Sequence, residues 1–329
     1  MSLLCSPFML GSRTVRNRVV LPPMVCAVMP SLHAAADGAG LITPALLAHY
    51  RVRAQGGAGL VIVEAAAVHP SGQCWSGGVT VFNSGCLPGL TRLAAALHDA
   101  GALAGIQLVH GGPQGNTALS GPLLGPSAID ARPGTPRPCA MTEEELGNVP
   151  VWFAKAAERA VAAGFDLIEL HGAHGFLLDS FLMTARNRRT DSYGGTPEHR
   201  MRLLLETVRA VRQRIGDTAV LGVRVSPFTK LEEGYPVEDY RLLVTALEAA
   251  GVEVLHLSTP AAFDPLFGAA RSLGQWTREF TPLPRIVAGG ITTAADAERL
   301  LAEGHTELVA VGRAQLANPN WAAEACAEK

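Results

Sequence analysis

Two histidines three residues apart are the residues in this sequence whose type and spacing most suggest chemistry. His171 and His174 lie in the segment ELHGAHGF, residues 169–176, directly after a short apolar run. A neutral imidazole can donate or accept a hydrogen bond near pH 7, and it is also a common metal ligand. Three interpretations are therefore open. The pair could bind a substrate oxygen, hold a metal together with His110 and Glu169, or have a structural role.

A second group of residues with a chemical pattern lies near the C-terminus. Gly289 and Gly290 follow one apolar run, and Gly312 and Arg313 follow the next. Glycine lets backbone N–H groups approach an anion, a following helix N-terminus adds its dipole, and arginine binds phosphate through two hydrogen bonds. The pattern favours a phosphate site, but the same glycines would also suit tight turns.

Short apolar runs that alternate with helical segments must position these residues. The runs are rich in β-branched residues and end in polar or glycine-rich turns. Ala–Gly pairs at 100–101, 163–164 and 250–251 predict left-handed helix ends. The predicted strands are 18–21, 60–64, 104–109, 167–170, 220–225, 254–258, 285–288 and 308–311. The predicted helices are 43–55, 88–100, 143–163, 199–215, 237–250 and 294–303.

Strands that are apolar throughout indicate a parallel sheet with both faces covered by helices. Eight strand–helix units are the number in a (β/α)8, or TIM, barrel. A doubly wound sheet is the competing architecture, but no GxGxxG motif follows an early strand. We therefore expect an α/β fold, a single TIM-barrel domain over residues 1–329, with a long loop over the barrel mouth at 111–141, after the third strand.

In a TIM barrel the active site is built at the C-terminal ends of the strands. Candidate site residues follow most of the predicted strands at that end, so we expect them to meet around one site. In strand order they are Pro22, Pro23 and Met24; Glu64 and Ala65; Gln107 and His110; Glu169, His171 and His174; Arg224; Gly289 and Gly290; and Gly312 and Arg313.

Composition excludes several classes of protein. The 27 Lys and Arg balance 29 Asp and Glu, so charge gives no reason to expect nucleic acid or an anionic membrane as a partner. A hydrophobic fraction of 48% with 17% charged residues argues against disorder. The six cysteines are scattered and predict thiols, and neither a signal peptide nor an apolar run of membrane length is present. We expect a cytoplasmic protein.

The segment HGAHGFLLDSFLMTARNRRTDSYGG, residues 171–195, resembles the signature of the Old Yellow Enzyme family of FMN-dependent ene-reductases. Further similar segments occur in the family's order and cover nearly the whole chain. They are NRVVLPPM (17–24), GLVIVEAAAV (59–68), GIQLVHGG (105–112), GVRVSP (222–227), VAGGI (287–291) and ELVAVGRAQLANPNW (307–321). The sequence is more similar to the shorter bacterial branch than to the plant and yeast branch.

The resemblance implies roles for individual residues. FMN would be bound by residues at the ends of most strands, with its phosphate at the two glycine turns and Arg313 and its pyrimidine edge at Gln107 and Arg224. His171 and His174 would donate hydrogen bonds to a carbonyl or nitro oxygen of the substrate. The implied FMN-binding residues are Pro23, Met24, Val25, Ala65, Gln107, Arg224, Gly289, Gly290, Gly312 and Arg313.

Departures from the family pattern concern the substrate side. The tyrosine that normally supplies a proton to the substrate is replaced by Phe176, whose ring has no exchangeable proton. Val25 occupies a position that is often Cys or Thr, Cys26 comes one residue later, and Ala27 stands where the bacterial branch often has tyrosine. Pro113 replaces a basic residue. We expect an intact flavin site and a more apolar substrate site.

The expected function is therefore NAD(P)H-dependent reduction of electron-poor alkenes, such as enones and related carbonyl or nitro compounds, by ping-pong hydride transfer. The cofactor would be FMN, with NADH or NADPH as reductant, and the proton would come from water or another group. The alternatives are a flavin-dependent isomerase, desaturase or nitroreductase, a flavin-binding protein with little turnover, or a metal enzyme. The partners would be a small-molecule substrate and, by analogy with the family, further copies of the chain in a dimer or larger oligomer.

Overall fold

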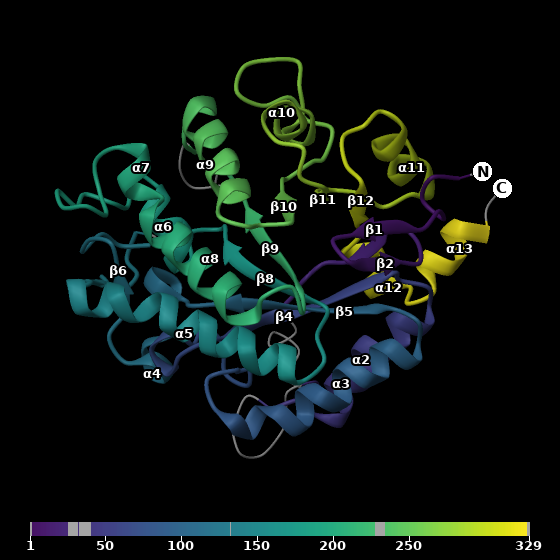
Figure 1. Cartoon of the computed structure of the whole chain (residues 1–329), viewed down its shortest axis with the longest axis horizontal. Helices are drawn as coiled ribbons and strands as arrows, with labels where there is room; N and C mark the ends of the chain where they lie inside the picture. Colours follow the sequence, from purple (N-terminus) through teal and green to yellow (C-terminus); the bar gives the residue numbers. More distant parts are fainter. Residues whose placement is uncertain (1, 26–31, 33–40, 132, 228–233, 328–329) are drawn as a thin grey trace.

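The computed structural model describes residues 2–25, 32, 41–131, 133–227 and 234–327. Within these residues, parallel strands close into a barrel in the order β10–β11–β12–β3–β4–β5–β8–β9. Followed around the closed barrel from β3, the strands come in their order along the chain, and the last strand, β12, pairs with the first, β3. The predicted (β/α)8 barrel is confirmed (Figure 1).

All eight predicted barrel strands are present, and most residues in them are buried. β4 continues beyond the predicted end because Ala66 and Ala67 pair with β5 after a register shift. β8 extends through His171, so this histidine lies on the strand itself. The strands are β3 (Val19–Leu21), β4 (Leu60–Ala67), β5 (Leu103–Val109), β8 (Leu167–Gly172), β9 (Val220–Val225), β10 (Val254–Ser258), β11 (Arg285–Ala288) and β12 (Leu308–Ala310).

Helices surround the barrel (Figure 1). Gly101, Gly164 and Gly251 have positive φ, as predicted for the residue after a helix. The predicted helix 199–215 is two helices, since Thr196 and Pro197 begin a separate short turn before it. The helices around the barrel are α2 (Pro44–Gln55), α3 (Leu87–Asp99), α5 (Glu143–Ala162), α7 (Pro197–Arg200), α8 (Arg202–Ile215), α9 (Val237–Ala249), α10 (Leu273–Phe280), α11 (Ala294–Ala302), α12 (Arg313–Ala317) and α13 (Trp321–Ala327).

An N-terminal hairpin closes one end of the barrel. Its strands, β1 (Phe8–Leu10) and β2 (Arg13–Val15), are antiparallel and were not predicted. Leu10 and Val15 join an apolar cluster with inward-facing residues of the barrel strands, such as Leu60. Because apolar side chains fill this end, polar chemistry inside the barrel is left to the opposite, C-terminal end.

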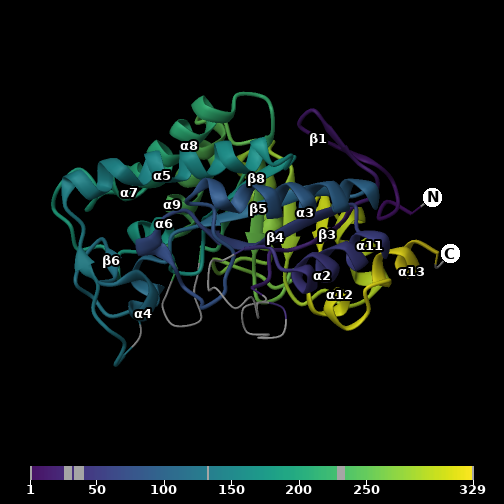
Figure 2. The ribbon, with the colours of Figure 1, turned by 90° about the horizontal axis from the view of Figure 1, so that it is seen from below.

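The segment 111–141, predicted as one long loop, contains short elements in its described part. They are η4 (Gly112–Gln114), α4 (Thr117–Ser120), β6 (Leu124–Gly125) and β7 (Cys139–Ala140). Both ribbon views place β6 and α4 on the side of the molecule away from the two termini (Figures 1 and 2).

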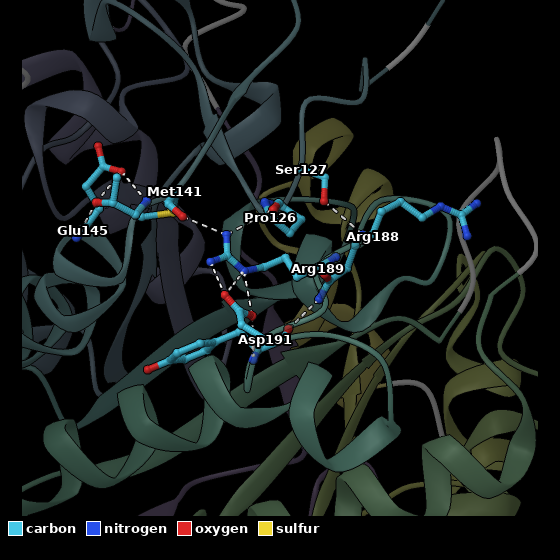
Figure 3. Close-up of polar contacts among 10 residues, drawn as sticks. Pro126, Ser127, Met141, Glu145, Arg188, Arg189 and Asp191 are labelled. Carbon is cyan, nitrogen blue, oxygen red and sulfur yellow. Dashed lines mark hydrogen bonds and ion pairs between the residues drawn. The ribbon is translucent and has the colours of Figure 1, made fainter.

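Arg189 fastens this segment to the chain that follows β8. Its guanidinium donates hydrogen bonds to the carbonyl oxygens of Pro126 (3.3 Å) and Met141 (2.7 Å), and Asp191 accepts from the same group (Figure 3). The backbone N–H of Arg188 donates to Ser127 Oγ at 2.9 Å. The arginines of the RNRRTD motif therefore hold the loop in place.

None of the helices in the described part of the chain combines the length and apolar character needed to cross a membrane. The five cysteines in the described ranges are free thiols, as predicted. Cys26 and Ala27 lie outside the described residues.

Candidate active site

The barrel interior becomes polar toward the C-terminal ends of the strands. Glu169 on β8 accepts a hydrogen bond from Gln107 Nε2 on β5 at 2.7 Å, and His256 Nδ1 on β10 lies 2.7 Å from its other oxygen. All three side chains are buried. Burial alone would raise the pKa of Glu169, but His256 and Arg224 outweigh it and hold this pKa below its usual value. Burial lowers the pKa of His256, so the pair is a carboxylate bound by a neutral imidazole.

Arg224 on β9 supplies a positive charge next to this pair. Its Nη2 donates to Ser258 Oγ at 3.1 Å and its Nη1 to the carbonyl oxygen of Pro23 at 3.4 Å. Its Nε is buried and has no hydrogen-bond partner among the described residues. Burial lowers the pKa of Arg224 and Glu169 opposes that shift, but an arginine stays protonated in any case. The site therefore contains a cation with a donor still available.

The two signature histidines lie side by side. His174 Nδ1 is 3.4 Å from His171 Nε2, and His174 Nε2 is 2.9 Å from Ser258 Oγ. The backbone of His174 has a φ of 62°, which is uncommon for a residue other than glycine. Three contacts hold this turn: Gln114 donates to the His174 carbonyl oxygen, Asp179 Oδ2 accepts from the N–H of Gly175, and Ser226 Oγ accepts from the N–H of His174. Such strain often accompanies a functional site.

Both histidines are neutral at pH 7. Burial, with further contributions from Arg224 and His256, lowers the pKa of His174 to about 3. Burial and the neighbouring His174 hold the pKa of His171 well below its usual value. His171 Nδ1 is buried without a hydrogen-bond partner among the described residues, whereas both ring nitrogens of His174 have one. His171 is thus the histidine with a ring nitrogen left for a ligand.

Phe176 contacts the histidine pair from the side. Its ring centroid lies 4.6 Å from that of His171 and 5.8 Å from that of Trp75, both in edge-to-face geometry. The sequence reasoning missed Trp75, which lies in the loop after β4 and carries no motif. The hydroxyl of Tyr50 contacts Glu64 on β4, and that of Tyr193 contacts Glu206 on α8. Phe176, which stands where the resembling family has a proton-donating tyrosine, therefore forms an aromatic wall with Trp75 beside His171.

A cavity of about 210 Å³ connects Arg224 with the two glycine turns. Six of the predicted cofactor-binding residues line it, which places them around one space. Pro23, Val25, Ala65 and Gln107 are not among its lining residues; Pro23 touches Arg224, and Ala65 lines a small recess beside Trp75. The lining residues are Pro22, Met24, Arg224, Ser258, Thr259, Ala288, Gly289, Gly290, Ile291, Ala310, Gly312 and Arg313.

The metal interpretation lacks the ligands it needs. Across the described ranges, no three His, Cys, Asp or Glu side chains are grouped so that they could hold a metal ion. His110, one proposed ligand, accepts from the N–H of Gly112 at 3.1 Å and contacts Ser71 Oγ at 3.0 Å. Glu169, the other, is bound by Gln107 and His256.

Comparison with known proteins agrees with this geometry. Residues 3–328 match the NADH:flavin oxidoreductase / NADH oxidase family. The NADPH dehydrogenase of Listeria welshimeri is 36% identical over 329 residues, which cover 99% of this chain and 94% of that protein. The NADPH dehydrogenase of Bacillus licheniformis is 35% identical over 322 residues, which cover 97% of this chain and 92% of that protein.

Two solved structures have the same architecture over nearly the whole chain. Morphinone reductase in complex with tetrahydroNAD matches with a TM-score of 0.86 and 27% identity, covering 98% of this chain and 90% of that one. The old yellow enzyme homologue from Zymomonas mobilis matches with a TM-score of 0.83 and 26% identity, covering 96% and 90%. The chain therefore belongs to the NADH:flavin oxidoreductase / NADH oxidase family, that of Old Yellow Enzyme, and is an FMN-dependent NAD(P)H oxidoreductase.

Proposed function

We propose that this enzyme reduces electron-poor alkenes, with NAD(P)H and the alkene using the same site in turn. The observation that carries the proposal is the neutral histidine pair beside Arg224, with His171 Nδ1 unpaired among the described residues. A neutral imidazole N–H can donate a hydrogen bond to a carbonyl oxygen and so polarise the conjugated alkene.

The proposed place for FMN is the cavity between Arg224 and Arg313, and the residues there fit its chemistry. Arg313 is exposed at the rim beside Gly312, and Gly290 has a φ of 66°, so its backbone adopts a turn that favours glycine. An arginine and two glycine turns suit a phosphate. At the other end Arg224 has a buried Nε without a partner in the described part of the chain, which suits the electron-rich edge of the flavin ring.

Bound FMN would supply hydride transfer between NAD(P)H and the β carbon of the alkene. The chain contributes charge and orientation to these transfers. Arg224 would stabilise negative charge at the pyrimidine edge, and Gln107 would hydrogen-bond the same edge. Met24, Pro23, Val25 and Ala65 would form the walls around the ring.

Phe176 limits where the proposed reaction can obtain its proton. Its ring packs on His171 and Trp75, so it can position an apolar or aromatic substrate but cannot supply a proton. The proton that completes alkene reduction must then come from water or from another group. This arrangement also suits reactions that need no such proton donor, which include isomerisation, desaturation and nitro reduction.

An anaerobic two-step experiment tests the proposal. The enzyme is first reduced with NADPH, then mixed with cyclohexenone, maleimide or a nitroaromatic compound, and flavin absorbance is followed. We expect reoxidation by cyclohexenone or maleimide and formation of the saturated product. Reoxidation by the nitroaromatic compound alone would assign a nitroreductase, and reoxidation by oxygen alone would refute reduction of alkenes.

Binding of a phenol tests the role of the histidines separately. Phenolates stacked on oxidised flavin give a long-wavelength charge-transfer band, and hydrogen bonds to their oxygen hold them there. His171→Ala and His174→Ala should each weaken phenol binding by about tenfold, the value of one hydrogen bond of roughly 1.4 kcal/mol. Unchanged phenol affinity in both variants would show that the pair does not bind the substrate oxygen.

A further inference from the structure

A buried carboxylate lies behind the residues proposed to face the flavin. Glu169 is 1% exposed and is absent from the cavity wall, yet it contacts Gln107 on β5 and His256 on β10 across the barrel interior. Gln107 donates to one of its oxygens and His256 to the other, each at 2.7 Å. A carboxylate that is fully buried and doubly hydrogen-bonded is costly to maintain unless it has a task.

The first consequence of this contact is a fixed amide. An ionised carboxylate can only accept hydrogen bonds, so the NH₂ group of Gln107 must point to Glu169. The carbonyl oxygen of Gln107 then points away from Glu169. In that orientation Gln107 offers an acceptor, which matches the N–H at the pyrimidine end of a flavin.

The second consequence is electrostatic. Glu169 and Arg224 are buried charges of opposite sign on adjacent strands, and they influence each other's pKa. The other titratable groups around them, His171, His174 and His256, are held neutral by burial. Because charges interact strongly in a buried site, the carboxylate offsets part of the positive field of Arg224.

We propose that Glu169, held in place by His256, is a positioning residue for the flavin. It fixes the amide of Gln107 and, by offsetting Arg224, lowers the reduction potential of the bound cofactor. This inference rests on the proposed placement of the flavin's pyrimidine edge at Gln107 and Arg224.

Two substitutions separate the two effects. Glu169→Gln removes the charge but keeps an oxygen that can accept from Gln107. Its NH₂ can donate to His256 Nδ1 when the neutral imidazole carries its proton on Nε2 instead. Reduced flavin should then bind about tenfold more tightly relative to oxidised flavin, which raises the two-electron midpoint potential by about 30 mV. Affinity for oxidised FMN should change by less than about threefold, because the hydrogen bond to Gln107 is retained.

Glu169→Leu removes both the charge and the acceptor. The potential should rise as in Glu169→Gln, and affinity for oxidised FMN should also fall by about tenfold, because the Gln107 amide is no longer fixed. Potentials are measured by anaerobic reduction against reference dyes, and FMN affinity by fluorescence quenching when FMN is added to the apoprotein. If Glu169→Leu does not fold, the potential of Glu169→Gln decides the proposal.

Glu303→Gln is a matched control. Glu303 also pairs with a histidine, His305, at 3.1 Å, but its side chain is 51% exposed and it precedes β12 at the far end of the barrel. This variant should leave both the potential and the FMN affinity unchanged.

The outcomes distinguish this inference from the placement on which it rests. If Arg224→Met alters FMN affinity and potential but Glu169→Gln leaves the potential at the parent value, the inference about Glu169 alone is overturned. If Arg224→Met changes neither quantity, the flavin's pyrimidine edge lies elsewhere, and both the placement and this inference fail.

Discussion

Lowering the pH from 7 to 5 should destabilise the apoprotein, because its fold buries histidines in the neutral form. Burial lowers the pKa of both His110 and His174 to about 3. In the unfolded chain a histidine has a pKa near 6.5. Between these values the unfolded state binds a proton that the folded state does not, so stability falls as the pH drops below about 6.5.

The size of the effect follows from the same values. At pH 5 an unfolded histidine with a pKa near 6.5 is almost fully protonated, whereas the folded one remains neutral. Each of the two histidines should then cost about 2 kcal/mol of unfolding free energy between pH 7 and pH 5, or about 4 kcal/mol together. Since total stabilities are commonly 5–15 kcal/mol, a change of this size is readily measured.

Urea unfolding of the apoprotein at the two pH values is the assay, with His110→Gln as the informative variant. His110 bonds Gly112 and Ser71 and lies outside the proposed chemistry, and glutamine can keep hydrogen bonds at this position without titrating. The variant should lose about 2 kcal/mol less than the parent between pH 7 and pH 5. An equal loss in parent and variant would refute the claim that His110 is held neutral.

Three further substitutions test the site and the fold. Phe176→Tyr should raise the rate at which an alkene reoxidises the reduced enzyme, measured by stopped-flow absorbance, because it restores a proton donor; no gain in rate or product would show that protonation is already provided elsewhere. Arg313→Ala should weaken FMN binding about tenfold while leaving riboflavin, which lacks the phosphate, unaffected, and equal losses for both flavins would place the phosphate elsewhere. Arg189→Ala should lower the free energy of unfolding in urea by about 2–3 kcal/mol, since it leaves Asp191 and two loop carbonyls without their donor. The substitution Arg188→Ala, of an exposed side chain, should lower it by less than about 0.5 kcal/mol. Similar losses in the two variants would contradict the conclusion that the Arg189 side chain holds the loop in place.

The barrel could be predicted because its strands are buried on both faces and therefore read as short apolar runs. Helix α10 was missed, although Ser272 and Gln275 form a capping box that is visible in the sequence. The N-terminal hairpin was missed because its strands have only three residues each, too few to show a period. Length, rather than composition, limited these predictions.

The site was predicted less completely than the fold. Residues at strand ends could be named because all parallel strands of a barrel end on the same side, and the cavity brings Arg224 together with Gly290 and Arg313 as expected. The contact between Glu169 and His256 could not be predicted, because His256 lies within an apolar strand and only the register shows that it faces inward. Trp75 was missed because its position in the loop depends on tertiary packing against Phe176.

A crystal structure of the FMN-loaded enzyme with a bound phenol would examine the whole site at once. We expect the phosphate at Gly290, Gly312 and Arg313, the pyrimidine edge against Gln107 and Arg224, and the phenol oxygen within hydrogen-bond distance of His171 or His174. A flavin bound in the reverse direction, or a phenol oxygen remote from both histidines, would contradict the proposed function.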